Sequence, residues 1–455
     1  MQMRSLKLGV AGMRGVIGSG LTPARIIDFA SAFGTFLNGG QVIVAWDTRI
    51  SSDMVSHAVI STLLSCGCQV YNAGVVPAPQ LQFMVPDMKA DGALLLGAGH
   101  QGAGWNAIIP IASNGAYFNN IQIQELLDIY HSRRYRVMNW NEIGKVHPVP
   151  ADAGDRYLDA LCSKIDVAAI RNAGFTVVAD FCNGTGSVIA EKFASRLGIK
   201  MIAINNVLSG ILPHEPEPRP RSSFQVQSIM TPLNADCGLV FNTDMSRLAV
   251  VTDTRETLSE EYTFPLIADY VLAKNPGPHT VVTNLCSTRT LDDIVAKYGG
   301  ELEKTKVGQA NMIDKMTETG AILAGEGSGS VAVKGWVNGF DSFMAAALLL
   351  ESMAVRKMTL SALTAALPRY FIVKKIINCP STHAYTVIRS LKKNFPDAAI
   401  NEDDGLRFDW EDGWISLRAA ATEPVIRMIA EYKNSETAVD RALYIRGLIE
   451  RLVAS

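Results

Sequence analysis

The sequence predicts an α/β protein with three α/β domains and a smaller α+β domain at the carboxyl end. Short apolar strands alternate with helices up to about residue 367, which is typical of mixed, mostly parallel sheets covered by helices. After residue 368 the alternation stops. There, 400–417 is expected to form hairpin strands around Asp412-Gly413, before a final helix at about 435–453. A chain of 455 residues has room for about three or four such domains.

The elements repeat in three similar units, in which strands end in polar or glycine-bearing loops. In the first unit a strand at 42–46 ends in the turn Asp47-Thr48-Arg49, and a helix follows at about 52–65. Further strands are expected at 93–96, 175–180, 238–241, 279–283 and 321–324. The domain boundaries expected from this pattern are 1–148, 149–253, 254–367 and 368–455.

Composition and charge exclude several classes of partner. The net charge of −2 does not favour a nucleic-acid or anionic-membrane surface, and the basic run 133–136 is interpreted as a solvated helix end. The apolar stretch Met344–Leu350 is too short to span a bilayer. The amino terminus shows no signal pattern, and the seven cysteines have no zinc spacing. A cytoplasmic protein with reduced thiols is therefore expected, with neither nucleic acid nor membrane as partner.

The glycine-rich loop 97–107 is the most informative segment. Its G-x-G-x-x-G pattern after an apolar strand is one signature of a dinucleotide site. However, Ile108-Ile109-Pro110 continues as extended chain where that signature needs a helix, because proline blocks helix formation. The acidic residue expected about twenty positions further on is also missing. A nucleotide-cofactor oxidoreductase therefore stays only as a remote alternative.

Five strand-end loops, taken in order, carry a more specific pattern. They lie at 9–15, 97–107, 241–247, 325–330 and 418–427. Their order and spacing resemble the phosphohexomutase superfamily of phosphoglucomutases, phosphomannomutases and phosphoglucosamine mutases along essentially the whole chain. Supporting stretches occur at 46–52, 214–218 and 305–308. The resemblance implies four domains arranged around a central cleft, and a reaction that moves a phosphoryl group between two hydroxyls of a hexose.

The same resemblance implies that the usual catalytic groups are missing. The family's phosphorylated serine falls at Gly99, which has no hydroxyl, and a lysine of the family falls at Ile109. His100 is retained beside the serine position. Phosphorylation of His100 itself is conceivable, but the resemblance gives this histidine an assisting role, and we expect it to form a hydrogen bond within its loop. No catalytic group is therefore expected to be intact.

The metal loop of the family normally supplies three aspartates, and only one is present. Asp244 remains, while Asn242 and Ser246 take the other two places. Mg²⁺ can be held by one or two carboxylates together with substrate phosphate. We therefore expect no cofactor beyond weakly bound Mg²⁺, with Asp244 as a vestigial ligand. Arg247 is expected to brace the loop by pairing with Asp244.

The remaining two loops keep part of their binding groups. In the sugar loop, Glu326 and Ser328 are retained as candidate sugar-binding residues. In the last loop, Arg418, Thr422 and Arg427 are retained as phosphate-binding residues, and the resemblance adds Arg14 from the first loop. These retained groups predict residual binding of a phosphorylated hexose.

Taken together, the losses predict a phosphohexomutase-like protein that is inactive or strongly impaired as a mutase. Such a protein would bind a sugar phosphate, or act as a regulatory or assembly subunit with a protein partner or a second copy. The alternative is an active intramolecular phosphotransferase with altered chemistry, in which the glycine-rich loop holds a phosphate of a hexose bisphosphate.

Overall fold

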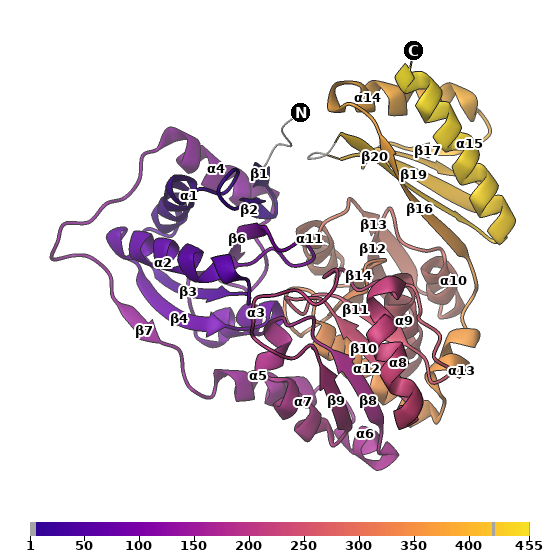
Figure 1. Ribbon diagram of the computed structural model, residues 1–455, viewed down its shortest axis with the longest axis horizontal. Coiled ribbons are helices and arrows are strands. Elements are labelled where there is room, and N and C mark those ends of the chain that lie inside the picture. Colours follow the sequence, from indigo (N-terminus) through magenta and orange to yellow (C-terminus); the bar gives the residue numbers. More distant parts are fainter. Residues whose placement is uncertain (1–5, 421–423, 455) are drawn as a thin grey trace.

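The computed structural model describes residues 6–420 and 424–454. Within these residues the strands form four sheets, of seven, four, four and five strands. Figure 1 shows the four corresponding domains, with the last one set above the third. The predicted four-domain α/β fold with mixed sheets is therefore confirmed.

The first sheet has the strand order β1-β2-β6-β5-β3-β4-β7. Its strands are β1 (Leu6–Gly9), β2 (Gly12–Val16), β3 (Gln41–Trp46), β4 (Gln69–Val75), β5 (Gly92–Leu96), β6 (Trp105–Ala112) and β7 (Val146–Pro148). Its helices are α1 (Pro23–Phe36), α2 (Ile50–Ser65), α3 (Ala78–Asp87) and α4 (Asn120–Ser132). The glycine-rich loop joins β5 to β6, and β6 runs antiparallel to β5. A strand after this loop, in place of a helix, excludes the dinucleotide-binding interpretation.

The second and third sheets share one plan, in which parallel strands are followed by an antiparallel edge hairpin. The second has the order β11-β10-β8-β9 and the third β13-β12-β14-β15. Their strands are β8 (Thr176–Asp180), β9 (Lys200–Ile204), β10 (Cys237–Phe241), β11 (Leu248–Val251), β12 (Thr280–Asn284), β13 (Glu301–Thr305), β14 (Leu323–Glu326) and β15 (Ser330–Val333). The hairpins β10–β11 and β14–β15 carry the expected metal and sugar loops, so two functional loops occupy equivalent places.

Helices surround these two sheets, and one continuous hydrophobic core joins them. The helices are α5 (Ala153–Cys162), α6 (Val167–Ala173), η1 (Thr185–Val188), α7 (Ala190–Leu197), η2 (Pro220–Ser223), α8 (Phe224–Leu233), η3 (Glu260–Tyr262), α9 (Thr263–Lys274), α10 (Thr290–Lys297), α11 (Gln309–Thr319), α12 (Ser342–Arg356) and α13 (Leu360–Ala365). Helix α12 is buried along most of its length, and its Phe343 packs against Phe181, Phe193 and Phe241 of the second domain. This shared core fixes the loop after Phe241 relative to the third domain.

The last domain is an antiparallel sheet with a hydrophobic core of its own. Its elements are β16 (Phe371–Asn378), α14 (Ser381–Ser390), η4 (Leu391–Asn394), β17 (Ala399–Asn401), β18 (Leu406–Asp409), β19 (Gly413–Ala419), β20 (Val425–Tyr432) and α15 (Ser435–Ala454). The expected hairpin around Asp412-Gly413 is formed by β18 and β19. Across the part of the chain that the structure describes, no helix is both long and apolar enough to cross a membrane.

Candidate functional site

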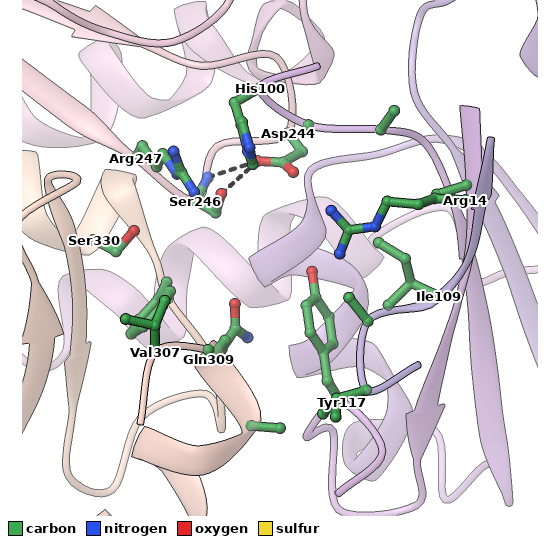
Figure 2. Close-up of a pocket in the computed structure, with 18 of the residues that line it drawn as sticks. Arg14, His100, Ile109, Tyr117, Asp244, Ser246, Arg247, Val307, Gln309 and Ser330 are labelled. Carbon is green, nitrogen blue, oxygen red and sulfur yellow. Dashed lines mark hydrogen bonds between the residues drawn. The ribbon is translucent and has the colours of Figure 1, made fainter. Parts of the chain in front are cut away.

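A cavity of about 260 Å³ lies where loops of the first three domains meet. Figure 2 shows side chains from all three domains pointing into it. Six of the expected site residues line this cavity together with Gly99: Arg14, His100, Asp244, Ser246, Arg247 and Glu326. Four of the five loops that the sequence singled out, those of the first three domains, therefore converge on a common space, as expected for α/β sheets, whose ligands bind beyond the strand ends.

Gly99 adopts a conformation that side chains rarely take. Its φ is +51°, and a β-carbon built on it would lie 2.5 Å from Oδ2 of Asp244. Its carbonyl oxygen accepts hydrogen bonds from Nη2 of Arg49 at 3.0 Å and from Oγ1 of Thr243 at 2.8 Å. The loop is thus held from two domains, and Asp244 occupies the space into which a side chain at position 99 would project.

This arrangement predicts that Gly99→Ala destabilises the protein. The left-handed backbone and the close approach of Asp244 are expected to lower the free energy of unfolding by about 1–3 kcal/mol. Gly102→Ala is the matched control, because a β-carbon there meets nothing within 4 Å and the backbone has no positive φ. Urea unfolding of both variants measures the difference, and equal stability of the two would contradict the expected strain at Gly99.

The loop after β10 is closed by the amide side chain of Asn242. Its Oδ1 accepts the backbone N–H groups of Ser246 and Arg247, both at 3.0 Å. Since a backbone N–H can only donate, this fixes the amide orientation and turns Nδ2 toward Asp244. Nδ2 then donates to Oδ1 of Asp244 at 2.7 Å and to Oγ of Ser246 at 3.1 Å. The Ser246 hydroxyl also donates to Oδ1 of Asp244, at 2.6 Å.

These contacts decide whether the loop fits a divalent cation. Nδ2 of Asn242 is a hydrogen-bond donor, and it contacts both Oδ1 of Asp244 and Oγ of Ser246, the two oxygens that would otherwise face a cation. Oδ1 of Asp244 also accepts from the backbone N–H and the hydroxyl of Ser246, so it has three donors in all. Mg²⁺ requires oxygen ligands with free lone pairs. In residues 6–420 and 424–454, no group of three or more His, Cys, Asp or Glu side chains could hold a metal ion. The present residues therefore do not fit Mg²⁺, and the amide takes over the role of holding the loop together.

Arg247 does not pair with Asp244, contrary to the sequence prediction. Its guanidinium forms an ion pair with Glu217, from the segment 214–218. Oδ1 of Asp244 already accepts hydrogen bonds from Asn242 and Ser246, whereas Oε1 of Glu217 lies directly against the guanidinium of Arg247. Burial works to lower the pKa of Arg247, but nearby carboxylates, chiefly Glu217, raise it overall. Arg247 therefore remains a positive charge at the cavity wall.

His214 anchors the segment that carries Glu217. Its Nε2 lies 3.1 Å from Oδ2 of the buried Asp180, at the end of β8. Burial opposes protonation of His214, but its hydrogen bonds to Asp180 and Cys182 raise its pKa to about 11. Because the histidine is more basic in the folded chain than in the unfolded one, its contribution to stability is complete below about pH 6.5.

This contribution is expected to disappear as pH rises from about 6.5 toward 11. The wild type should be more stable than His214→Gln near pH 6, and the difference should shrink steadily through that range. Unfolding by urea at pH 6, 8 and 9.5 measures it. A constant difference across these pH values would show that His214 is not charged in the folded protein.

The sugar loop forms a tight turn in which Glu326 is already engaged. Oε2 of Glu326 accepts from Nδ2 of Asn284 at 2.7 Å, and Oε1 accepts from the Ser328 hydroxyl at 2.7 Å. Glu326 and Ser330 line the cavity, whereas Ser328 is not among the lining residues. Gly327 leaves room for Glu261, whose carboxylate would collide with any β-carbon at that position. Glu326 can thus face a ligand, and Ser328 serves to orient it.

The two arginines expected to bind phosphate lie side by side on one face of the last sheet. Arg418 on β19 and Arg427 on β20 are cross-strand partners, so their side chains share a face. Nε of Arg418 donates to Oδ1 of Asp404 at 3.0 Å. The charge of Arg427 contributes to lowering the pKa of His100, which places it within electrostatic reach of the cavity. Thr422, the third predicted member of this group, lies outside the described residues.

His100 forms the hydrogen bond within its loop that the sequence predicted. Its Nε2 lies 3.0 Å from Nε2 of the Gln101 side-chain amide. The charge of Arg247, together with burial and further arginine charges, lowers the pKa of His100 well below its usual value. The imidazole is therefore neutral at pH 7. The lowered pKa of His100 therefore shows that the positive charges of several arginines act on this one cavity.

Three groups that favour an anionic ligand at the cavity wall had not been fully recognised from the sequence. The guanidinium of Arg14, on β2, points into the cavity (Figure 2) and forms no hydrogen bond or ion pair with the described residues. Nε2 of Gln309 is buried without a partner in the described part of the chain. Gly308, Gln309 and Ala310 place the amino end of α11 at the cavity, where backbone N–H groups favour anions. The stretch 305–308 had pointed to this segment only through the family resemblance.

The four-domain fold, with loops of three domains around one cavity, agrees with the resemblance to the phosphohexomutase superfamily. The family models for the phosphoglucomutase/phosphomannomutase α/β/α domains I, II and III match residues 5–136, 155–255 and 259–371. The chain is 31% identical to a probable phosphoglucosamine mutase of Pyrococcus furiosus over 449 residues, which are 98% of each protein. It is also 31% identical to a phosphoglucomutase/phosphomannomutase of Thermococcus kodakarensis, covering 94% of the chain and 95% of the relative.

Solved structures agree with these sequence matches. A phosphoglucomutase/phosphomannomutase family protein from Burkholderia thailandensis superposes with a TM-score of 0.84 at 26% identity, covering 99% of this chain and 97% of that one. A putative phosphomannomutase from Thermus thermophilus has the same fold, with a TM-score of 0.82 at 22% identity, covering 99% and 100%. The chain belongs to the phosphoglucomutase/phosphomannomutase family.

Proposed function

We propose that this protein binds a phosphorylated hexose in the cavity and acts on it as an intramolecular phosphotransferase with altered chemistry. The observation that carries the proposal is Arg14, a half-buried guanidinium that faces the cavity and has no partner among the described residues. A buried cation without a partner is costly, and a phosphate supplies both the opposite charge and two acceptor oxygens. The relatives that match nearly the whole chain are named as mutases, which favours activity over inactivity.

The cavity offers complementary groups for the other parts of such a ligand. On one wall, Gln309 and the amino end of α11 supply N–H donors for phosphate oxygens. On another, Glu326 supplies carboxylate oxygens that accept hydrogen bonds from sugar hydroxyls. Arg427, whose charge acts on His100, is suited to hold a second phosphate from the side of the last domain.

The altered chemistry follows from the two loops that differ from the family. Gly99 offers no hydroxyl, and the amide-closed loop around Asn242 does not fit Mg²⁺. The positive charges of Arg14 and Arg247 therefore have to stabilise the charge that develops on a transferring phosphoryl group. We expect turnover to be slow relative to the family, because the cavity lacks both the serine hydroxyl and a loop that fits Mg²⁺.

A second candidate function is a binding or regulatory subunit without turnover. The glycine at position 99 and the isoleucine at position 109 favour it, because they remove the usual nucleophile and a basic residue from the same cavity. In this case the bound sugar phosphate would control association with a protein partner or a second copy of the chain.

A coupled mutase assay separates the two functions. It uses glucose, mannose and glucosamine phosphates with a catalytic amount of glucose 1,6-bisphosphate, in parallel with thermal shift measurements of binding. Turnover that persists in EDTA supports the altered phosphotransferase. Stabilisation by sugar phosphates without turnover assigns the binding function. Absence of both turnover and stabilisation contradicts both functions.

A further inference from the structure

Asp244 is the side chain in the cavity that stands in the place of the missing serine. Its Oδ2 lies 2.5 Å from the point where the β-carbon of residue 99 would be. Within residues 6–420 and 424–454, Oδ2 receives no hydrogen bond, whereas Oδ1 receives three. The two oxygens thus have different functions: Oδ1 fixes the carboxylate to its loop, and Oδ2 faces the cavity with free lone pairs.

The other candidate nucleophiles in the cavity are less well placed. The Ser246 hydroxyl donates a hydrogen bond to Oδ1 of Asp244, and the Ser330 hydroxyl is hydrogen-bonded to the Ser328 hydroxyl. The Tyr117 phenol is held neutral, because burial and the charge of Asp244 raise its pKa. Nε2 of His100 accepts from the amide of Gln101, which leaves its protonated Nδ1 for other contacts. Oδ2 of Asp244 is thus the oxygen next to the serine position that no hydrogen bond of the described residues engages.

We propose that Oδ2 of Asp244 accepts the phosphoryl group from a hexose bisphosphate and returns it to a hexose monophosphate, in place of the missing serine. This inference rests on the proposed function, since it needs a phosphorylated hexose in the cavity. It also gives Gly99 a positive role: only a residue without a β-carbon leaves Oδ2 of Asp244 this access.

The step is a phosphoryl transfer between two oxygens. Oδ2 forms a bond to phosphorus while the bond between phosphorus and the sugar oxygen breaks. The sugar oxygen keeps the electron pair and takes a proton from the solvent, so the products are a hexose monophosphate and an aspartyl phosphate. In the reverse step, the other hydroxyl of the monophosphate attacks the aspartyl phosphate and loses its proton, which regenerates a bisphosphate and the free carboxylate. Carboxylates form such phosphorylated intermediates in other enzymes.

The surroundings of Asp244 suit this role. Arg14 and Arg247 line the same cavity and supply two positive charges for the phosphoryl oxygens. The three hydrogen bonds to Oδ1 hold the carboxylate plane, so that Oδ2 stays directed into the cavity. Ala78, at the start of α3, also donates its backbone N–H to the carbonyl oxygen of Asp244 at 3.0 Å, which ties this residue to the first domain.

The test is to trap the phosphorylated protein. The full chain is incubated with ³²P-labelled glucose 1,6-bisphosphate in EDTA and denatured, and the label that stays on the protein is treated with alkali, acid and hydroxylamine. An aspartyl phosphate is lost in alkali and in hydroxylamine, a phosphohistidine survives alkali, and a phosphoserine survives acid. We expect label that alkali and hydroxylamine remove, and hydroxamate on the peptide that contains Asp244.

Two variants complete the test. Asp244→Asn should lose the label, while Asp53→Asn, whose carboxylate is 79% exposed on α2, should keep it. Thermal stabilisation of Asp244→Asn by the bisphosphate shows that this variant is folded and still binds. Label that survives hydroxylamine, label retained in Asp244→Asn, or absence of label in a wild type that the bisphosphate stabilises would each overturn the role of Asp244 and leave the proposed function standing. A wild type that is neither labelled nor stabilised would overturn both.

Discussion

Replacing Arg14 with alanine is expected to weaken the binding of glucose 1,6-bisphosphate about 10- to 150-fold. A hydrogen-bonded contact to a charged group contributes about 1.5–3 kcal/mol, and each 1.4 kcal/mol is about a tenfold change in affinity. Arg14 has no partner among the residues that the structure describes, so its removal leaves no protein group unpaired. The loss of affinity therefore reports the contact with the ligand, and titration calorimetry measures it directly.

Arg133→Ala is the matched control for Arg14→Ala. Its side chain is 74% exposed at the end of α4 and pairs with Asp28. The substitution Arg133→Ala removes the same charge from the first domain at a position outside the cavity. The affinity for glucose 1,6-bisphosphate should change less than about twofold, as expected for a distant, screened charge. Equal affinities of Arg14→Ala and the wild type would show that the phosphate does not bind at this arginine.

Replacing Phe343 with alanine should destabilise the second and third domains together by about 3–5 kcal/mol. Phe343 is fully buried, and its ring lies 4.8 Å from that of Phe193 and 5.7 Å from that of Phe241. Because the core is continuous between these domains, the cavity left by the missing ring weakens both. It also loosens the support of Phe241, directly before the loop of Asn242 and Asp244.

Phe224→Ala serves as the control, because this side chain is 67% exposed at the start of α8. Urea unfolding should place the midpoint of Phe343→Ala well below that of Phe224→Ala and the wild type. A loss of less than 1 kcal/mol in Phe343→Ala would contradict the shared core. Separate unfolding of the second and third domains in the wild type would contradict it as well.

The fold could be predicted from the sequence because its signals are local. Apolar strands that alternate with helices indicated three α/β domains, and the change after residue 368 indicated a different last domain. The extended chain after the glycine-rich loop was also predictable, since Pro110 forbids the helix that a dinucleotide site requires, but the antiparallel direction of β6 was not. The order of strands within each sheet depends on long-range pairing and was not predicted.

The site could be predicted only as a set of loops. Which loops meet followed from the family resemblance, but the partners of individual side chains did not. Arg247 pairs with Glu217, thirty positions away in sequence, because the loop of His214 folds against β8. Gln309 carried no signal of its own. Asn242 was identified as a lost ligand, but its two-sided amide, which closes the loop, becomes evident only from the backbone N–H groups around it.

The sequence prediction of an inactive protein counted the groups that are missing. The structure adds what stands in their place: an amide in the metal loop and the carboxylate of Asp244 beside Gly99. Together with the mutase names of the relatives, this favours the alternative that the sequence had left open, an active phosphotransferase with altered chemistry.

The most direct measurement is the binding of glucose 1,6-bisphosphate to the wild type, by titration calorimetry in EDTA and again with Mg²⁺, followed by a crystal structure of the complex. The ligand should bind equally well under both conditions, with one phosphate at Arg14 and the amino end of α11. Binding that requires Mg²⁺, or a complex with the ligand outside the cavity, would contradict the account.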